Sequence, residues 1–409
     1  MSGGASQEAE PTAGSPPEAH TSSVHGSRDQ ENGGGTGGAK LDYYSHEVVF
    51  KANERSERER AYQSTLASYN ESSNTWEAHR ERIHRILGKF VDREKETISK
   101  KEWRFIKDLC RRGIPFSERP RAWFVLCGAA EEKRKSPVTY SALLAKVAKD
   151  LDEKVARQIE GDINRTFPAH EVFQSPKGTE VLKNVLSVFA LVHPDVGYAQ
   201  GLNFVAGMLI LVCGCKAEDD IFWMLTAIVQ KRMYPNTYGE DLKGCHVGQK
   251  IFDRLVQNKF PKVFKHFESL GCELSLVTSE WLLCLFSRSF PSETVARIWD
   301  SLLFEGFKIF YRVSLGFIRL LHDKILQCDN LGDLITFMKE EVRSCVNNEQ
   351  VMRRAFHGIG SMRSKVIIKY AIRYESEVEA MLDLYAQKKR ERRSQGKDDG
   401  ENDQSDDVM

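Results

Sequence analysis

The sequence lacks a hydrophobic run long enough to cross a membrane. Its longest apolar stretch covers residues 204–215 and includes two glycines, whereas a membrane-spanning helix needs about 18 or more apolar residues. Residues 1–40 contain almost no large apolar side chains, which argues against a secretory signal peptide there. We therefore expect a soluble, cytoplasmic protein that reaches endomembranes only peripherally or through a partner.

The sequence also lacks an excess of charge of either sign. It holds 59 Lys and Arg residues against 58 Asp and Glu residues, and its formal net charge is +1. Proteins dedicated to nucleic acids usually carry a clear basic excess, because they neutralise phosphate groups. We therefore expect no nucleic-acid partner.

No pair of cysteines has the C-x-x-C spacing that is typical of zinc and redox sites. The nine cysteines are odd in number and most lie in apolar stretches, which predicts buried thiols in a reducing compartment. A redox role for Cys213 and Cys215 is the less favoured alternative. The eleven histidines show no metal-ligand spacing, so we predict no metal site and no cofactor of the protein's own.

Common motifs of nucleotide enzymes and hydrolases are missing as well. The sequence contains no G-x-x-x-x-G-K-[ST], G-x-S-x-G or H-E-x-x-H motif, which argues against a P-loop enzyme, an α/β-hydrolase and a zincin. Gly33, Gly35 and Gly38 spell G-x-G-x-x-G, but no strand is predicted before them and no helix after them, so we treat the match as chance. We expect no small-molecule substrate of the protein's own.

Helical patterns, by contrast, fill most of the chain. In one segment Ser175 is a candidate N-cap, Pro176 suits the first helical position, and Pro194 follows the end. Residues 217–233 begin with acidic and end with basic side chains, which complements the helix dipole, and Gly306 is a candidate helix stop. Alternating apolar stretches are nearly absent. The predicted fold class is all-α, with a single large multi-helix domain.

Composition divides the chain into a central domain and two tails. The first forty residues hold nine Gly, six Ser and three Pro, too little apolar surface to offset the entropy of ordering. The end of the chain has a basic run at 388–393 and an acidic run after it, and such charge blocks stay solvated. The predicted divisions are a disordered tail at 1–40, a helical lead-in at 41–109, the main domain at 110–325, completing helices at 326–387 and a charged disordered tail at 388–409.

Two polar clusters stand out within the main domain. In the first, Asp162 and Arg165 are spaced to share one face of a helix. The second is a glycine-bracketed segment between two apolar helices that carries Tyr198, Gln200 and Asn203. From residue types alone, an ordinary helix ion pair, a loop hydrogen bond and helix packing explain them better than a functional site does. The residues by themselves predict a large helical domain with a polar seam.

The order I-x-x-D-x-x-R followed by Y-x-Q-G-x-N resembles the TBC domain of Rab GTPase-activating proteins. The segment 111–123 looks like the opening of that domain, with Gly113, Ile114 and Pro115 before Arg119 and Trp123. Residues 297–306, which include Trp299 and Asp300, look like its later helix. The resemblance covers roughly residues 110–325, and the layout is most similar to the growth hormone-regulated branch of the family.

The resemblance implies a role for each cluster. Arg165 and Gln200 would act in trans on GTP held by a Rab GTPase in its GTP form, and that partner would carry GTP and Mg²⁺. The expected effect is faster GTP hydrolysis, which switches off a step of vesicle traffic, without an independent enzymatic activity. The supporting residues would be Asp162, which orients Arg165, and Tyr198, Gly201 and Asn203, which fix the loop of Gln200.

Arg119 and Trp123 are assigned by the resemblance to partner binding or to the scaffold, and both readings stay open. Two alternatives to the activator remain. One is a Rab-binding scaffold or effector that uses the same surface without accelerating hydrolysis. The other is a helical adaptor unrelated to GTPases, in which the paired motifs are a coincidence. The presence of both Arg165 and Gln200 favours the activator.

Overall fold

The structure is a computed structural model that describes residues 40–41, 44, 47–48, 55–92, 96–239 and 241–394. The predicted disorder of residues 1–39, and that of the tail from residue 395 onward, lies outside the described residues. None of the described helices is long and apolar enough to cross a membrane.

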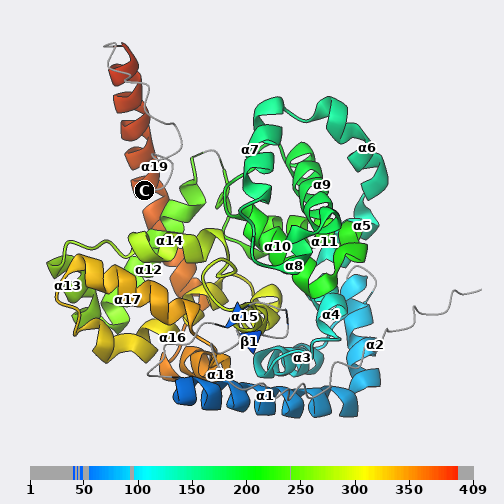
Figure 1. The fold of residues 1–409 in the computed structure, drawn as a ribbon, viewed down its shortest axis with the longest axis horizontal. Coiled ribbons are helices and arrows are strands. Elements are labelled where there is room, and N and C mark those ends of the chain that lie inside the picture. Colours follow the sequence, from blue (N-terminus) through cyan, green and yellow to red (C-terminus); the bar gives the residue numbers. More distant parts are fainter. Residues whose placement is uncertain are drawn as a thin grey trace, which may run out of the picture. The chain divides into compact units, whose positions relative to one another are not determined.

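The predicted all-α class is confirmed (Figure 1). Two-residue strands, β1 (Lys40–Leu41) and β2 (Glu47–Val48), form one short antiparallel pair. The helices are α1 (Arg55–Ala78), α2 (Arg80–Val91), α3 (Lys100–Arg112), α4 (Arg119–Leu126), α5 (Ala129–Lys135), α6 (Tyr140–Asp150), α7 (Glu153–Ile163), α8 (Glu171–Gln174), α9 (Pro176–Val192), α10 (Leu202–Cys213), α11 (Glu218–Ala227), α12 (Lys243–Lys259), α13 (Pro261–Ser269), α14 (Ser275–Leu283), α15 (Ser292–Glu305), α16 (Lys308–Ile325), α17 (Leu331–Arg343), α18 (Asn348–Arg353) and α19 (Ser364–Ser394). Short helical turns are the 3₁₀ segment η1 (Cys215–Ala217) and the π-helical segments η2 (Ile228–Arg232) and η3 (Arg354–Gly358).

Local sequence signals explain several helix ends. Ser175 accepts a hydrogen bond from the backbone N–H of Gly178, and Pro176 occupies the first turn of α9, as predicted. Gly306 ends α15 with a φ of 81°, a conformation that glycine adopts without steric cost. These signals place the helices but not their partners, which depend on packing.

Helix α15 is the centre of the core, and nearly all of its side chains are buried. It packs against α3, α4, α16 and α18 (Figure 1). The carboxylate of Asp300 on α15 accepts hydrogen bonds from Arg119 at 3.0 Å, from the Trp123 indole at 2.9 Å and from the backbone of Ile114 at 2.9 Å. The buried Asp300 cluster, defined by Asp300, Arg119 and Trp123, therefore joins the opening of the main domain to a much later helix.

This cluster corrects one expectation about partner binding. Arg119 is 1% exposed and Trp123 is fully buried, so neither side chain has surface that a partner protein could touch. Burial alone would lower the pKa of Arg119, but the charge and hydrogen bonds of Asp300, together with Tyr44 and Tyr69 nearby, raise it above its usual value. Of the two readings of these residues, the structure fits the scaffold.

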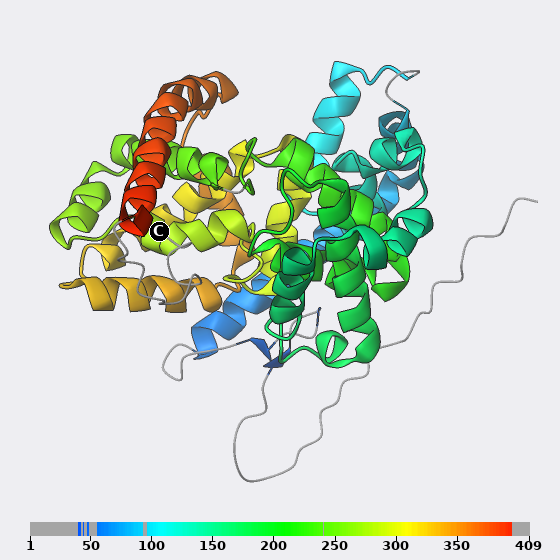
Figure 2. The same cartoon turned by 90° about the horizontal axis from the view of Figure 1, so that it is seen from above.

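The end of α19 corrects a second expectation. The helix continues through the basic run at 388–393 to Ser394, whereas the charge blocks predict a loss of structure from residue 388. Figures 1 and 2 show α19, in orange to red, lying along α12 with its last turns extending beyond it. Lys and Arg are good helix formers, and basic side chains complement the C-terminal end of a helix dipole.

The cysteines behave as predicted for small buried hydrophobes. Six of the nine are buried, and all nine are free thiols. Burial raises the pKa of Cys213 and of Cys215, which disfavours the reactive thiolate form. The redox alternative for this pair therefore gains no support.

Candidate functional site

Arg165 lies just after the C-terminal end of α7. Pro168 prevents the helix from continuing, because it lacks an N–H and clashes with a preceding turn. The Arg165 side chain is 52% exposed, and its guanidinium forms an ion pair with the buried carboxylate of Asp162 one turn earlier. Asp162 thus contacts one terminal nitrogen of the guanidinium, and Arg165 forms no ion pair or hydrogen bond through its side chain with any other described residue.

Asp162 also connects this segment to the second polar cluster. The Tyr198 hydroxyl, from the loop between α9 and α10, donates a hydrogen bond to Asp162 Oδ2 at 2.5 Å. Burial and this bond to a carboxylate raise the pKa of Tyr198, so its phenol stays protonated and keeps donating. The two motifs, 36 residues apart in sequence, meet at one carboxylate.

A second bridge runs beside the first. The Asn203 side-chain amide donates to the Thr166 hydroxyl oxygen at 2.8 Å, and that hydroxyl donates to the backbone carbonyl of Asp162 at 2.7 Å. The other end of the Asn203 amide accepts a hydrogen bond from the backbone N–H of Gly201 at 3.1 Å. Thr166 and Asn203 are both fully buried. The predicted clusters are therefore joined by two parallel sets of hydrogen bonds.

Gln200 lies at the tip of the loop that this network holds. Its side chain is exposed and forms no hydrogen bond with any other described residue. Gly201 follows with a φ of 111°, and a Cβ there would lie 3.0 Å from the carbonyl oxygen of Leu283. Only glycine fits both the conformation and the close approach. The backbone of the loop is thus fixed while the Gln200 amide is left available.

Packing beneath the loops adds rigidity that the sequence motifs did not reveal. A Cβ at Gly207 on α10 would lie 2.9 Å from the Phe167 ring, so α10 and the segment after Arg165 are in close contact. The Phe167 ring also packs edge-on against Phe204 at 5.4 Å. Sequence reasoning missed Thr166 and Gly207. The signal for Thr166 is a polar side chain directly beside Arg165, whereas Gly207 has no signal apart from its place in an apolar helix.

The assembled site is an exposed cation and an exposed amide on two loops that a shared buried network holds together. An arginine fork can donate several hydrogen bonds to a phosphate. A glutamine amide can accept a hydrogen bond from a water molecule while it donates another. Among the described residues, no group of three or more His, Cys, Asp or Glu side chains is arranged to hold a metal ion.

Comparison with known sequences agrees with the motif resemblance. The family description Rab-GTPase-TBC domain matches residues 117–326. The growth hormone-regulated TBC protein 1-A of Danio rerio is 35% identical over 269 residues, which cover 64% of this chain and 74% of that protein. The human growth hormone-regulated TBC protein 1 is 34% identical over 271 residues, covering 65% of this chain and 79% of the relative. Human TBC1 domain family member 2A is 32% identical over 279 residues, and the match spans only 30% of its length.

Solved structures show the same fold. The RabGAP TBC domain from the Chlamydomonas flagellum is 27% identical, with a TM-score of 0.66 over 78% of this chain and 99% of that one. The Ypt/Rab-GAP domain of Gyp1p, at 20% identity, has a TM-score of 0.54 over 72% of this chain and 98% of that one, which supports the fold alone. The predicted family is confirmed, and this chain belongs to the Rab-GTPase-TBC domain family.

Proposed function

We propose that this chain accelerates GTP hydrolysis by a Rab-family GTPase in its GTP form, and that Arg165 and Gln200 supply the catalytic groups in trans. Membership of the family supports the broad activity. The observation that carries the residue assignment is that both side chains are exposed on loops joined by Tyr198–Asp162 and Asn203–Thr166 contacts. A joined pair of loops can present two groups to one partner site in a fixed relation.

Each side chain has a defined task in this proposal. In phosphoryl transfer, charge spreads over the phosphoryl oxygens, and the Arg165 guanidinium donates hydrogen bonds to them. The Gln200 amide accepts a hydrogen bond from the attacking water and so orients it in line. GTP and Mg²⁺ enter with the partner. An arginine supplied in trans contributes about 10³–10⁵ in rate, which corresponds to about 4–7 kcal/mol of barrier.

Asp162 and Tyr198 act as positioning residues in this scheme. The Asp162 carboxylate contacts one terminal nitrogen of the Arg165 guanidinium and leaves the remaining donors for phosphate oxygens. The Tyr198 hydroxyl in turn fixes the Asp162 carboxylate. Prior positioning lowers the entropy that is lost when the partner docks. The Rab would bring the chain to an endomembrane, where the activity ends a step of vesicle traffic.

We also propose that the lead-in at 41–109 and the helices at 326–387 form part of the same functional body as residues 110–325. Tyr62 on α1 donates a hydrogen bond to Glu293 at 3.2 Å, and Thr65 donates to the carbonyl of Val346 at 3.1 Å. These contacts tie the lead-in to segments far along the chain. A truncated chain that begins at residue 110 should therefore be less stable than the full chain.

The test is single-turnover phosphate release from a panel of GTP-loaded Rabs with wild type, Arg165→Ala and Gln200→Ala. Arg343→Ala is the matched control, because Arg343 on α17 is exposed and forms no ion pair with a described residue. We expect GTP hydrolysis by one or a few Rabs to be accelerated. Arg165→Ala and Gln200→Ala should each lose most of this acceleration, while the control keeps it.

Other outcomes separate the alternatives. Binding of a GTP-loaded Rab without acceleration by wild type would replace the activator with a Rab-binding scaffold. Acceleration that persists in both Arg165→Ala and Gln200→Ala would show that the catalytic groups lie elsewhere on the chain. Thermal unfolding of each variant, measured in parallel, shows whether activity is lost because the side chain is missing or because the variant is less well folded.

A further inference from the structure

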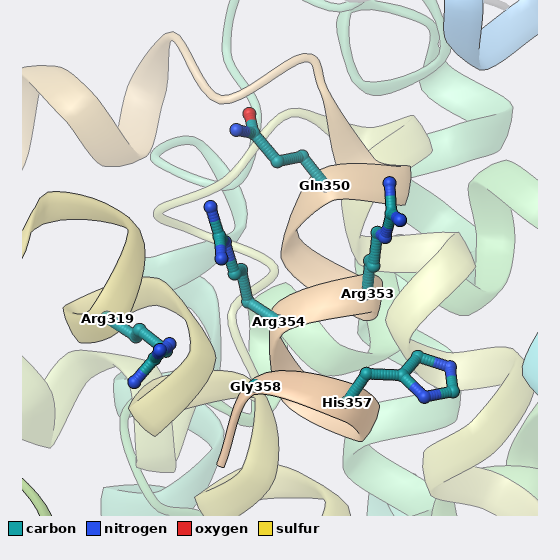
Figure 3. Close-up of a pocket in the computed structure, with 6 residues that line it drawn as sticks. All are labelled: Arg319, Gln350, Arg353, Arg354, His357 and Gly358. Carbon is teal, nitrogen blue, oxygen red and sulfur yellow. The ribbon is translucent and has the colours of Figure 1, made fainter.

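A basic groove lies between α16 and the segment formed by α18 and η3 (Figure 3). Its volume is about 490 Å³, and the lining residues are Arg319 from α16 together with Gln350, Arg353, Arg354, His357 and Gly358. In Figure 3 the Arg354 side chain lies between those of Gln350 and Arg319, and Arg353 and His357 stand on the other side of the helix. This basic groove contains no acidic lining residue.

The arginines of the basic groove differ from their neighbours in having no counter-charge. Arg319, Arg353 and Arg354 form no ion pair with any described acidic side chain. Close by, Arg111 makes a bidentate pair with Glu305 and Arg297 pairs with Glu349 at 2.7 Å. Like charges that share a small space repel one another. The unpaired arginines therefore give this surface a positive potential that favours an anion.

The backbone that carries the basic groove is π-helical in part and packs directly against α16. The segment η3 is π-helical, a rare geometry that occurs often at functional sites. Arg312 on α16 donates a hydrogen bond to the carbonyl of Ala355 at 2.9 Å, and a Cβ at Gly316 would lie 2.8 Å from the Ala355 nitrogen. Helix α16 and η3 are thus in direct backbone contact, which gives the basic side chains a rigid base.

Gly358 brings two of the arginine stems together. A Cβ at this position would lie 3.1 Å from Arg319 Cδ and 3.5 Å from Arg354 Cδ. The two side chains therefore converge over the bare Cα of the glycine, although they come from different helices. Two guanidinium forks that approach from two directions can bind separate oxygens of a phosphorylated ligand.

We propose that the basic groove binds a ligand that carries two or more phosphate groups. Arg319 and Arg354 together supply more donors than one carboxylate can accept, and their planar forks match phosphate geometry. The volume lies within the range of small-ligand pockets, roughly 300–1,000 Å³. The basic groove belongs to α16, α18 and η3, whereas Arg165 follows α7 and Gln200 lies in the loop before α10 (Figure 1). This site is therefore separate from the proposed GTPase chemistry.

The same chemistry occurs in a soluble polyphosphate and in a phosphorylated lipid headgroup, so the test has two arms. In the first, isothermal titration of the full chain uses inositol hexakisphosphate, with inorganic phosphate and a polyglutamate peptide as comparison ligands. In the second, sedimentation uses phosphatidylcholine vesicles with and without a phosphatidylinositol bisphosphate. Each arm compares wild type with Arg319→Gln, Arg354→Gln and the matched control Arg343→Gln.

We expect the hexakisphosphate to bind more tightly than inorganic phosphate or polyglutamate. Each groove substitution should weaken that binding about tenfold, because a hydrogen bond to a charged group contributes an affinity of that order, and Arg343→Gln should leave it unchanged. Groove-dependent binding to the bisphosphate vesicles would identify a lipid source. Groove-dependent binding of the soluble probe alone would identify a soluble one.

Three results would overturn the proposal. The first is that neither probe binds, and the second is that Arg343→Gln weakens binding as much as the groove variants do, which would indicate a diffuse charge effect. The third is equal binding of polyglutamate and the hexakisphosphate, which would make the basic groove an acidic-peptide site. The side chains of Arg319, Arg354 and Arg343 are all exposed, so the variants should fold, and thermal unfolding checks this.

Discussion

Two arginines of this protein each pair with an aspartate, but in opposite surroundings. Arg119 is 1% exposed and uses its donors inside the protein, on Asp300 and on the Tyr44 hydroxyl at 2.9 Å. Arg165 is 52% exposed and is held by Asp162. The family motifs suggest a functional contact for both residues, yet only one of them can reach another molecule.

The difference shows what becomes possible when an aspartate binds only part of an exposed guanidinium. A buried guanidinium must have its donors satisfied internally, because an unpaired buried charge is very costly. An exposed guanidinium can leave donors to water and exchange them for a partner's phosphate at little cost. In both pairs the aspartate is the fixed element, and the exposure of the arginine separates a structural role from the proposed catalytic one.

The sharpest way to break this comparison is Arg165→Lys, which keeps the charge and removes the planar fork. We expect it to lose most of the 10³–10⁵-fold acceleration, since a lysine ammonium cannot make the same paired hydrogen bonds. Unfolding free energy should change by no more than about 0.5 kcal/mol at this exposed position. Single-turnover phosphate release and urea denaturation measure the two effects. Full activity in the lysine variant would show that charge alone suffices.

The buried pair is tested by Asp300→Ala. This change leaves Arg119 charged and buried without its main partner, so we expect the free energy of unfolding to fall by about 3–5 kcal/mol. Urea denaturation gives the value, with Asp329→Ala as the control, because Asp329 is an exposed carboxylate. Equal stability of the two variants would contradict the structural role of the Asp300 cluster.

A subtler change, Tyr198→Phe, tests whether Asp162 must be fixed to present Arg165. It deletes only the hydroxyl that donates to Asp162. We expect acceleration to fall about tenfold and stability by about 1 kcal/mol, the usual contribution of one such hydrogen bond. Tyr385→Phe, at an exposed tyrosine, is the matched control for phosphate release and for melting. Unchanged activity in Tyr198→Phe would remove the positioning role.

A third carboxylate extends the comparison to an aspartate without an arginine. Asp253 on α12 is half-buried, and its Oδ1 has no hydrogen-bond partner among the described residues. Burial raises its pKa from 3.8 to about 6. The folded state therefore binds more protons than the unfolded state between these values, and stability from this group rises as pH falls through about 6.

Asp253→Asn should accordingly stabilise the protein at pH 7, where the carboxylate is charged in both states. The expected gain is about 1–2 kcal/mol, less than the full shift implies because the group is partly solvated. The gain should shrink as the pH is lowered from about 6 towards about 4, where wild type becomes protonated. Urea denaturation across this range measures it. A gain that does not vary with pH would show that the titration of Asp253 is not its cause.

The helices and several residues of the candidate site could be predicted from local sequence patterns. The cap at Ser175 and the stop at Gly306 are local signals, and both are present in the structure. The motif spacing singled out Asp162, Tyr198 and Asn203, which the structure brings together. The helix ends could be predicted because they depend on residues near one another in sequence, whereas the grouping of Asp162, Tyr198 and Asn203 was suggested by the family pattern, and their functional roles remain predictions.

The rest depends on contacts between distant segments, which local patterns do not encode. The burial of Arg119 follows from Asp300, 181 residues later. The link from Asn203 to Thr166 joins two segments whose packing depends on Gly207. Helix α19 continues past residue 388 through a run of Lys and Arg, which are good helix formers, although the charge blocks alone indicated a loss of structure there.

The pairing of Arg119 with Asp300 also has a consequence for biosynthesis. Ribosomes add about 5–20 residues per second, so Arg119 leaves the ribosome about 10–40 s before the aspartate that neutralises it. During that interval the buried Trp123 and its apolar neighbours have no α15 to pack against. The nascent chain therefore presents an unfinished hydrophobic surface, and chaperones that bind such surfaces should associate with it until α15 emerges.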